Sequence, residues 1–224
     1  MEHKKKVNFR EYILGGQDGL VNVLGLVLGV AAATLSSQIV ILSGIVATVA
    51  ESVSMAAVAY TSSKAAKDYY KSITEEERQY VRKKPKLEEK TIREIYYKKG
   101  FRGKILNLVV KQITKDKKLW AETLLLEEHK IEFESPLKSG WIVGISTLFG
   151  SLIPLIPFFF LPVKIGIITS LILAAFSLFI VGALKAKLSI GNWKRSGIEM
   201  TIIGIIAALV GYGIGLLLKI NVVG

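Results

Sequence analysis

Residues 15–63 read GGQDGLVNVLGLVLGVAAATLSSQIVILSGIVATVAESVSMAAVAYTSS. This stretch predicts two apolar helices joined by a short polar turn, Ser-Ser-Gln, at residues 36–38. Each helix contains one acidic residue, Asp18 in the first and Glu51 in the second. An ionised side chain at the centre of a membrane span costs about 2.5–3.5 kcal/mol on insertion scales, so such residues normally have a functional role. The stretch therefore predicts both a membrane fold and a functional site.

The composition of the chain is that of a membrane protein with one inserted polar module. The 224 residues are 51% hydrophobic and 21% charged, with a net charge of +12, and most of the charges lie in residues 64–138. In a membrane protein such a positive excess indicates loops that face the cytosol and anionic lipid rather than nucleic-acid binding. The chain has no cysteine and two histidines. This composition excludes a disulfide framework, a thiolate metal site and a histidine-rich metal centre.

Five segments are long and apolar enough to cross a bilayer, which requires about 20 apolar residues each. We therefore predict an all-α polytopic protein with transmembrane helices over residues 13–35, 39–62, 139–161, 163–184 and 197–218. The predicted organisation is an N-terminal tail with helices 1 and 2, a small cytosolic helical bundle, and helices 3 to 5. The corresponding boundaries are 1–63, 64–138 and 139–224.

The distribution of lysine and arginine predicts the orientation of these spans. With the N-terminus in the cytosol, the outer face receives only Lys164 and Lys219, and the other loop charges face inward. The protein is thus predicted to be integral and multi-pass, with residues 64–138 cytosolic. The small size and short N-terminus favour a prokaryotic cell membrane, with a vacuolar membrane as the alternative.

The inserted module is predicted to consist of short helices. Thr74 and Glu77 form a capping-box pattern that predicts a new helix start, and Pro85 is expected to end that helix. An amphipathic stretch follows and stops at Gly100. The last helix is predicted over residues 119–133.

Polar side chains recur on one face of each of the first two helices. Asp18 and Asn22 are one helical turn apart, and Glu51 and Met55 are one turn apart on the next helix, with Thr48 on the same face. The two helices are antiparallel, so Asp18 and Met55 are expected at similar depth. Carboxylate and thioether ligands together indicate a divalent transition metal.

Other roles remain open for these residues. Asp18 and Glu51 could be buried structural acids, and methionine most often serves to pack a core. A protonatable carboxyl group inside the membrane also suits proton coupling, which makes Glu51 a second metal ligand or a proton carrier.

The polar module contains many glutamates on its predicted helices. A bundle lined with carboxylates could bind divalent cations, and the acids on these helices include Glu77, Glu88, Glu94 and Glu128. The alternative is a solvated surface on which glutamates pair with the abundant lysine and arginine four residues away. No prosthetic group and no catalytic residue are predicted.

The order of these parts resembles the vacuolar iron transporter family of Fe²⁺/Mn²⁺:proton antiporters. The matching segments are DGLV at 18–21, SMAA at 54–57 with a following tyrosine, EIY at 94–96 with KKGF at 98–101, LIPLIP at 152–157 and GYGIG at 211–215. The resemblance implies a five-span homodimer with the metal path between protomers, no enzymatic activity, and Fe²⁺ or Mn²⁺ as transported substrate. It places the path aspartate at Asp18 and the path methionine at Met55.

The chain also departs from the pattern of that family. Ala59 stands where a glutamate commonly follows the path methionine. Tyr80 and Thr91 replace one glutamate in each of two cytosolic pairs, and leucines at 124 and 125 replace a methionine pair. The cytosolic metal store is therefore expected to be reduced.

The sequence thus favours a transporter that exports Fe²⁺ or Mn²⁺ from the cytosol in exchange for protons, with the membrane and divalent metal ions as partners. Two alternatives stand beside it. One is a membrane-anchored interaction protein with a vestigial metal path, and the other is a passive divalent-cation channel.

Overall fold

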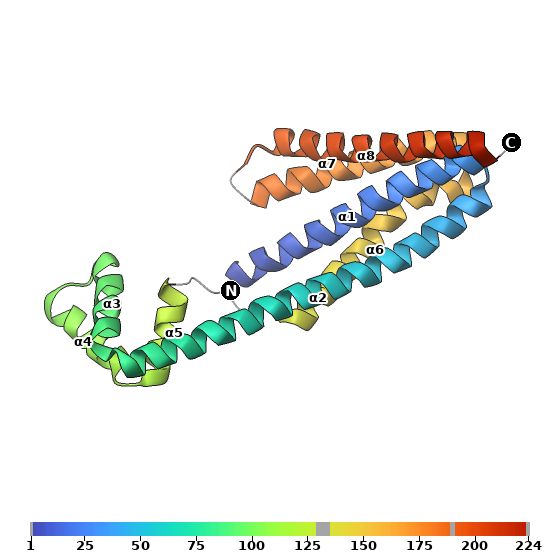
Figure 1. Ribbon diagram of the computed structural model, residues 1–224. Coiled ribbons are helices and arrows are strands. Elements are labelled where there is room, and N and C mark those ends of the chain that lie inside the picture. Colours follow the sequence, from blue (N-terminus) through green and yellow to red (C-terminus); the bar gives the residue numbers. More distant parts are fainter. Residues whose placement is uncertain (1, 129–134, 189–190, 223–224) are drawn as a thin grey trace. The chain divides into compact units, whose positions relative to one another are not determined.

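The computed structural model describes residues 2–128, 135–188 and 191–222, and the described residues form eight helices and no strand. The helices are α1 (Glu2–Thr34), α2 (Ser37–Lys83), α3 (Pro85–Lys98), α4 (Gly103–Thr114), α5 (Lys117–Glu128), α6 (Pro136–Phe160), α7 (Val163–Leu188) and α8 (Trp193–Val222) (Figure 1). The chain divides into two compact units. The first comprises Met1–Thr61 and Pro136–Gly224, and the second comprises Ser62–Ser135.

Five of the described helices are long and apolar enough to span a bilayer, as predicted. They are Phe9–Thr34, Ser37–Lys83, Pro136–Phe160, Val163–Leu188 and Trp193–Leu218. The all-α, five-span fold class is therefore confirmed.

The predicted helix start at Thr74 is wrong, because α2 continues without a break from Ser37 to Lys83. The Thr74 hydroxyl donates to the Tyr70 carbonyl at 2.7 Å, one turn back within the same helix. A threonine hydroxyl can bond backward in this way as readily as it caps a new helix. The helix ends before Pro85, as expected, and Pro85 opens α3.

A turn of two residues, Leu35 and Ser36, connects α1 to α2, shorter and one residue earlier than predicted. Leu35 has φ of 50°, in the left-handed region that is unfavourable for a residue with a Cβ atom. The Ser36 hydroxyl accepts the Ile39 N–H at 3.5 Å and so caps the start of α2.

Helix α1 is the centre of the first unit and packs against α6, α7 and α8 (Figure 1). Its leucines and valines at positions 20, 23, 24, 27 and 28 are buried. Glycines let the backbones meet. A Cβ atom at Gly29 would lie 2.7 Å from the Gly211 carbonyl oxygen, and one at Gly211 would overlap the Gly25 carbonyl. Small residues thus allow close packing of α1 against α8.

The second unit has its own apolar core, formed by the end of α2 and by α3, α4 and α5. Its buried side chains include Val81, Ile92, Val110, Trp120 and Leu124. Helix α3 ends at Lys98, and Gly100 follows with φ of 99°, which explains why a glycine stands there. Helix α5 is described to Glu128, and residues 129–133 of the predicted last helix lie outside the described residues.

Candidate ion site in the membrane

Three of the four predicted membrane-site residues meet between α1 and α2. The Asn22 side-chain amide donates a hydrogen bond to Glu51 Oε1 at 2.8 Å. The Asp18 carboxyl group, one turn earlier on α1, lies close enough to interact with the side chains of both Glu51 and Asn22. Two acidic residues and one amide from two membrane-spanning helices therefore form a single polar cluster, which we call the carboxyl cluster.

The register of the two helices places Met55 beside this cluster. Val27 of α1 lies against Gly44 of α2, with Cγ1 3.1 Å from the Cβ position of the glycine, and Asn22 contacts Glu51 further along. In this antiparallel register Asp18 is level with Met55. The methionine is half-buried and lies one turn from Glu51, so its sulfur atom is available at the cytosolic side of the cluster under the predicted orientation.

The carboxyl cluster lies at the surface of the protomer. Asn22 is exposed, and Asp18 and Glu51 are half-buried. Within a span, this surface would face hydrocarbon, where uncovered carboxyl groups are costly. In a single chain this face of the cluster is therefore uncovered.

The chemistry of the cluster suits either a proton or a cation. Two carboxylates in contact repel each other when both are ionised, and the repulsion is relieved when a proton or a metal ion lies between them. The described residues contain no group of three or more His, Cys, Asp or Glu side chains placed to hold a metal ion. One protomer thus supplies two carboxyl groups and an amide, which is fewer ligands than a divalent cation usually takes.

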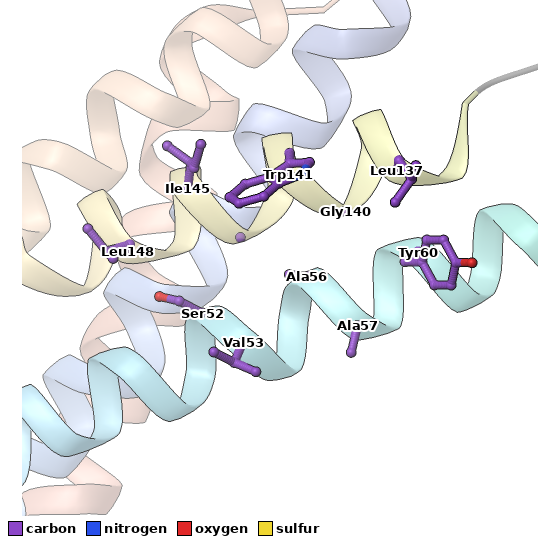
Figure 2. A pocket seen from close by; sticks show the side chains of 11 residues that line it. Ser52, Val53, Ala56, Ala57, Tyr60, Leu137, Gly140, Trp141, Ile145 and Leu148 are labelled. Carbon is purple, nitrogen blue, oxygen red and sulfur yellow. The ribbon is translucent and has the colours of Figure 1, made fainter.

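A groove that the sequence did not predict lies between α2 and α6. It has a volume of about 470 Å³ and is lined by apolar side chains such as Val53, Leu137, Trp141 and Ile145 (Figure 2). The two helices touch beside it, where a Cβ atom on Gly144 would lie 2.8 Å from that of Ala56. The spacing of Gly140 and Gly144 was the available signal. Its lining has no acidic residue, so the groove is not the ion site.

The predicted metal ligands of the second unit are not assembled into a site among the described side chains. Glu94 pairs with Lys90 at 3.8 Å, and Glu88 is half-buried on the same helix. The side chains of Glu77 and Glu128 lie outside the described residues. Other acids of the unit pair with lysine or arginine, including Glu127, which bonds to Lys99. The described part of this unit thus favours the ion-paired alternative.

The sequence is similar to named transporters along most of its length. Vacuolar iron transporter 1 of Tulipa gesneriana is 28% identical over 91% of this chain and 84% of its own length. Vacuolar iron transporter 1 of Arabidopsis thaliana is also 28% identical, over 91% of this chain and 83% of its own. Protein CCC1 of Saccharomyces cerevisiae is 27% identical over 88% of this chain and 65% of its own.

The profile of the VIT family matches residues 9–216, which include the first four spans, all but the last two residues of the fifth, and the whole second unit. The match agrees with the resemblance carried by DGLV, SMAA and GYGIG in the spans. The chain belongs to the vacuolar iron transporter family.

Proposed function

We propose that this protein is a homodimeric transporter that exports Fe²⁺ or Mn²⁺ from the cytosol in exchange for protons. The observation that carries the proposal is the contact of Asp18, Asn22 and Glu51 between two membrane-spanning helices. Membership of the vacuolar iron transporter family supports metal transport. The transported ion is a substrate, and the proposal requires no prosthetic group and no enzymatic step.

Proton coupling follows from the charge of the cluster. With both carboxyl groups protonated, Asp18 and Glu51 are neutral. With both ionised and a divalent ion bound, the site is again neutral. Only these two states avoid a net charge inside the membrane. One metal ion therefore exchanges for two protons at this pair.

Each neighbour of the pair has a distinct task. Asn22 donates to Glu51 and fixes the orientation of its carboxyl group. Met55 offers a thioether, a ligand that favours transition metals over Mg²⁺ and Ca²⁺. The four residues form the proposed transport path.

A second copy of the chain is proposed to cover the exposed cluster. A two-fold axis beside Asn22 would bring two clusters together, remove both from lipid and double the carboxylate ligands. The chain has no native cysteine, so a single Leu26→Cys variant should form a disulfide-linked dimer under mild oxidation. Leu26 is exposed one turn from Asn22. Ile168→Cys, exposed on α7, serves as the control and should not become disulfide-linked.

Two finer assignments belong to the same proposal. Glu77, Glu88, Glu94 and Glu128 remain the predicted cytosolic ligands, on a unit whose described acids are mostly ion-paired. The names of the relatives favour a vacuolar membrane over the prokaryotic cell membrane predicted from size. Cell fractionation would distinguish the two membranes.

The decisive experiment is divalent-ion uptake into proteoliposomes with and without an imposed pH gradient. We expect gradient-dependent Fe²⁺ or Mn²⁺ flux that is lost in Asp18→Ala and retained in Glu199→Gln, an exposed acid on α8 far from the cluster in sequence. Flux that ignores the gradient would identify a channel. No flux from a folded protein would favour the interaction-protein alternative.

A further inference from the structure

Two buried hydroxyl groups stand out in the first unit. Thr48 on α2 is 3% exposed and Ser151 on α6 is 0% exposed, and neither hydroxyl oxygen has a hydrogen-bond partner among the described residues. Buried hydroxyls in helices usually donate to a backbone carbonyl one turn back. Thr147, which is also fully buried on α6, does this with the Val143 carbonyl at 2.8 Å.

The contacts between α2 and α6 define an antiparallel register. Near the inner end, the Cβ position of Gly144 lies 3.2 Å from the Ser52 carbonyl oxygen. About two turns nearer the start of α2, Gly44 lies against the Leu155 side chain. The contact stripe on α2 therefore runs through positions 44, 48 and 52, and the stripe on α6 through 144, 151 and 155.

This register places Thr48 and Ser151 at the same level on facing stripes. Ser151 also borders α1, because its hydroxyl oxygen lies 2.5 Å from the Cβ position of Gly19. Gly19 adjoins Asp18, and Thr48 precedes Glu51 by three residues. The two hydroxyls thus lie where α1, α2 and α6 meet, on the buried side of the carboxyl cluster.

We propose that Thr48 and Ser151 bind a water molecule at this junction. Each hydroxyl has one donor and two acceptor positions, and a buried water typically makes about three hydrogen bonds to otherwise unpaired polar groups. A cation would satisfy the hydroxyl oxygens but leave both O–H donors unpaired. A water molecule satisfies donors and acceptors together, and neither hydroxyl adds a charge to the interior.

The water has a role in the proposed antiport, and this role rests on that proposal. It provides a proton donor and acceptor beside Asp18 and Glu51, away from exposed Asn22. Protons and metal ions would then reach the same carboxyl pair from different sides. The water site itself does not depend on transport and is tested without it.

The test is a double-mutant cycle on thermal unfolding of the purified full chain in lipid nanodiscs. Thr48→Val and Ser151→Ala should each lower Tm by about 2–4 °C, the shift of one net hydrogen bond in a chain of this length. The double variant should be little worse than either single one, because both substitutions release the same water. The matched control is Thr147→Val, whose effect should add to that of Thr48→Val.

Three results would overturn the proposal. A raised Tm in both variants would mean that the hydroxyls are unpaired, and unchanged Tm values would mean that they bond to their own helices. A direct bond between the two side chains would also give coupling, so water-edited solid-state NMR is the second measurement. It should show rapid magnetisation transfer from water to Thr48 and slow transfer to Thr147, whereas slow transfer to both would exclude the water.

Discussion

At the scale of single residues, Asn22 is the link between the two acids of the carboxyl cluster. Its amide donates to Glu51 at 2.8 Å and also lies beside the Asp18 carboxyl group. A hydrogen bond to a charged group contributes about 1.5–3 kcal/mol, which corresponds to a tenfold or larger change in affinity. If the cluster binds the transported ion as proposed, the Asn22 amide should therefore contribute measurably to the affinity.

Replacing the Asn22 amide tests its proposed contribution to metal-ion binding. Asn22→Leu should weaken Mn²⁺ binding at least about tenfold, because the Glu51 carboxylate loses its orienting donor. The measurement is isothermal titration of the purified protein with Mn²⁺. Asn107→Leu is the control, since that amide also bonds to a charged side chain, Arg93, at 2.6 Å, but lies in the second unit. Equal loss in both variants would contradict the assignment.

Met55 allows a separate test of metal choice. Met55→Leu conserves volume, so the stability cost should stay below about 1.5 kcal/mol. Loss of the thioether should lower the preference for Fe²⁺ over Mg²⁺, measured by competition in the proteoliposome assay. Unchanged selectivity with unchanged total flux would show that Met55 only packs.

The sequence reveals the acids but not their partners. Asp18 and Glu51 are conspicuous because their neighbours are apolar, and this contrast needs no structure to be seen. The pairing of Glu51 with Asn22 depends on the register of α1 against α2, which glycine contacts and side-chain fit determine only in the folded chain. The register is also what reveals Thr48 and Ser151 as facing residues.

At the scale of elements, the contact of α1 with α8 depends on backbone approach. Gly211 packs on the Gly25 carbonyl, whereas the Cβ position of Gly213, two residues away, has no atom within 4 Å. An added methyl group would therefore clash with the backbone of α1 at Gly211 and would meet no atom at Gly213.

This difference gives a matched pair of substitutions. Gly211→Ala should destabilise by about 1–3 kcal/mol through overpacking, and thermal unfolding should show a lower Tm. Gly213→Ala should be neutral or slightly stabilising, because alanine favours a helix by up to about 1 kcal/mol over glycine. A lower Tm for Gly213→Ala alone would contradict the described packing.

Local patterns predicted some element boundaries and missed others. Proline at 85 and glycine at 100 restrict or permit backbone angles, so they marked helix ends correctly. The Thr74–Glu77 pattern failed because the same hydroxyl can cap a new helix or bond back to Tyr70, and the continuation of α2 decides which. The polar residues 36–38 indicated the turn between α1 and α2, but the sequence has no signal for the positive φ of Leu35.

At the scale of the whole molecule, the proposed orientation is testable because the chain has no native cysteine. Lys98→Cys and Lys164→Cys place single thiols at exposed positions in the second unit and at the start of α7. When the protein is produced in the cell membrane of a bacterial host, a membrane-impermeant maleimide should label Lys164→Cys on intact cells and Lys98→Cys only after permeabilisation, because positive loops face the cytosol. The reverse labelling pattern would mean that the protein has the opposite orientation, and the direction proposed for the exchange would then be reversed.

The glycines along α1 have a mechanical consequence. On one side Gly25 and Gly29 meet the backbone of α8, and on the other Gly16 meets Gly150 of α6. Interdigitated side chains resist the sliding of one helix along another, whereas glycine has no side chain that could interdigitate. Helix α1, which holds Asp18 and Asn22, has no interdigitated side chains at these glycine contacts, but its leucines and valines at positions 20, 23, 24, 27 and 28 are buried in the core. An axial shift that carried Asp18 and Asn22 past Glu51 would therefore have to repack these buried side chains, and the core holds the two residues at one depth.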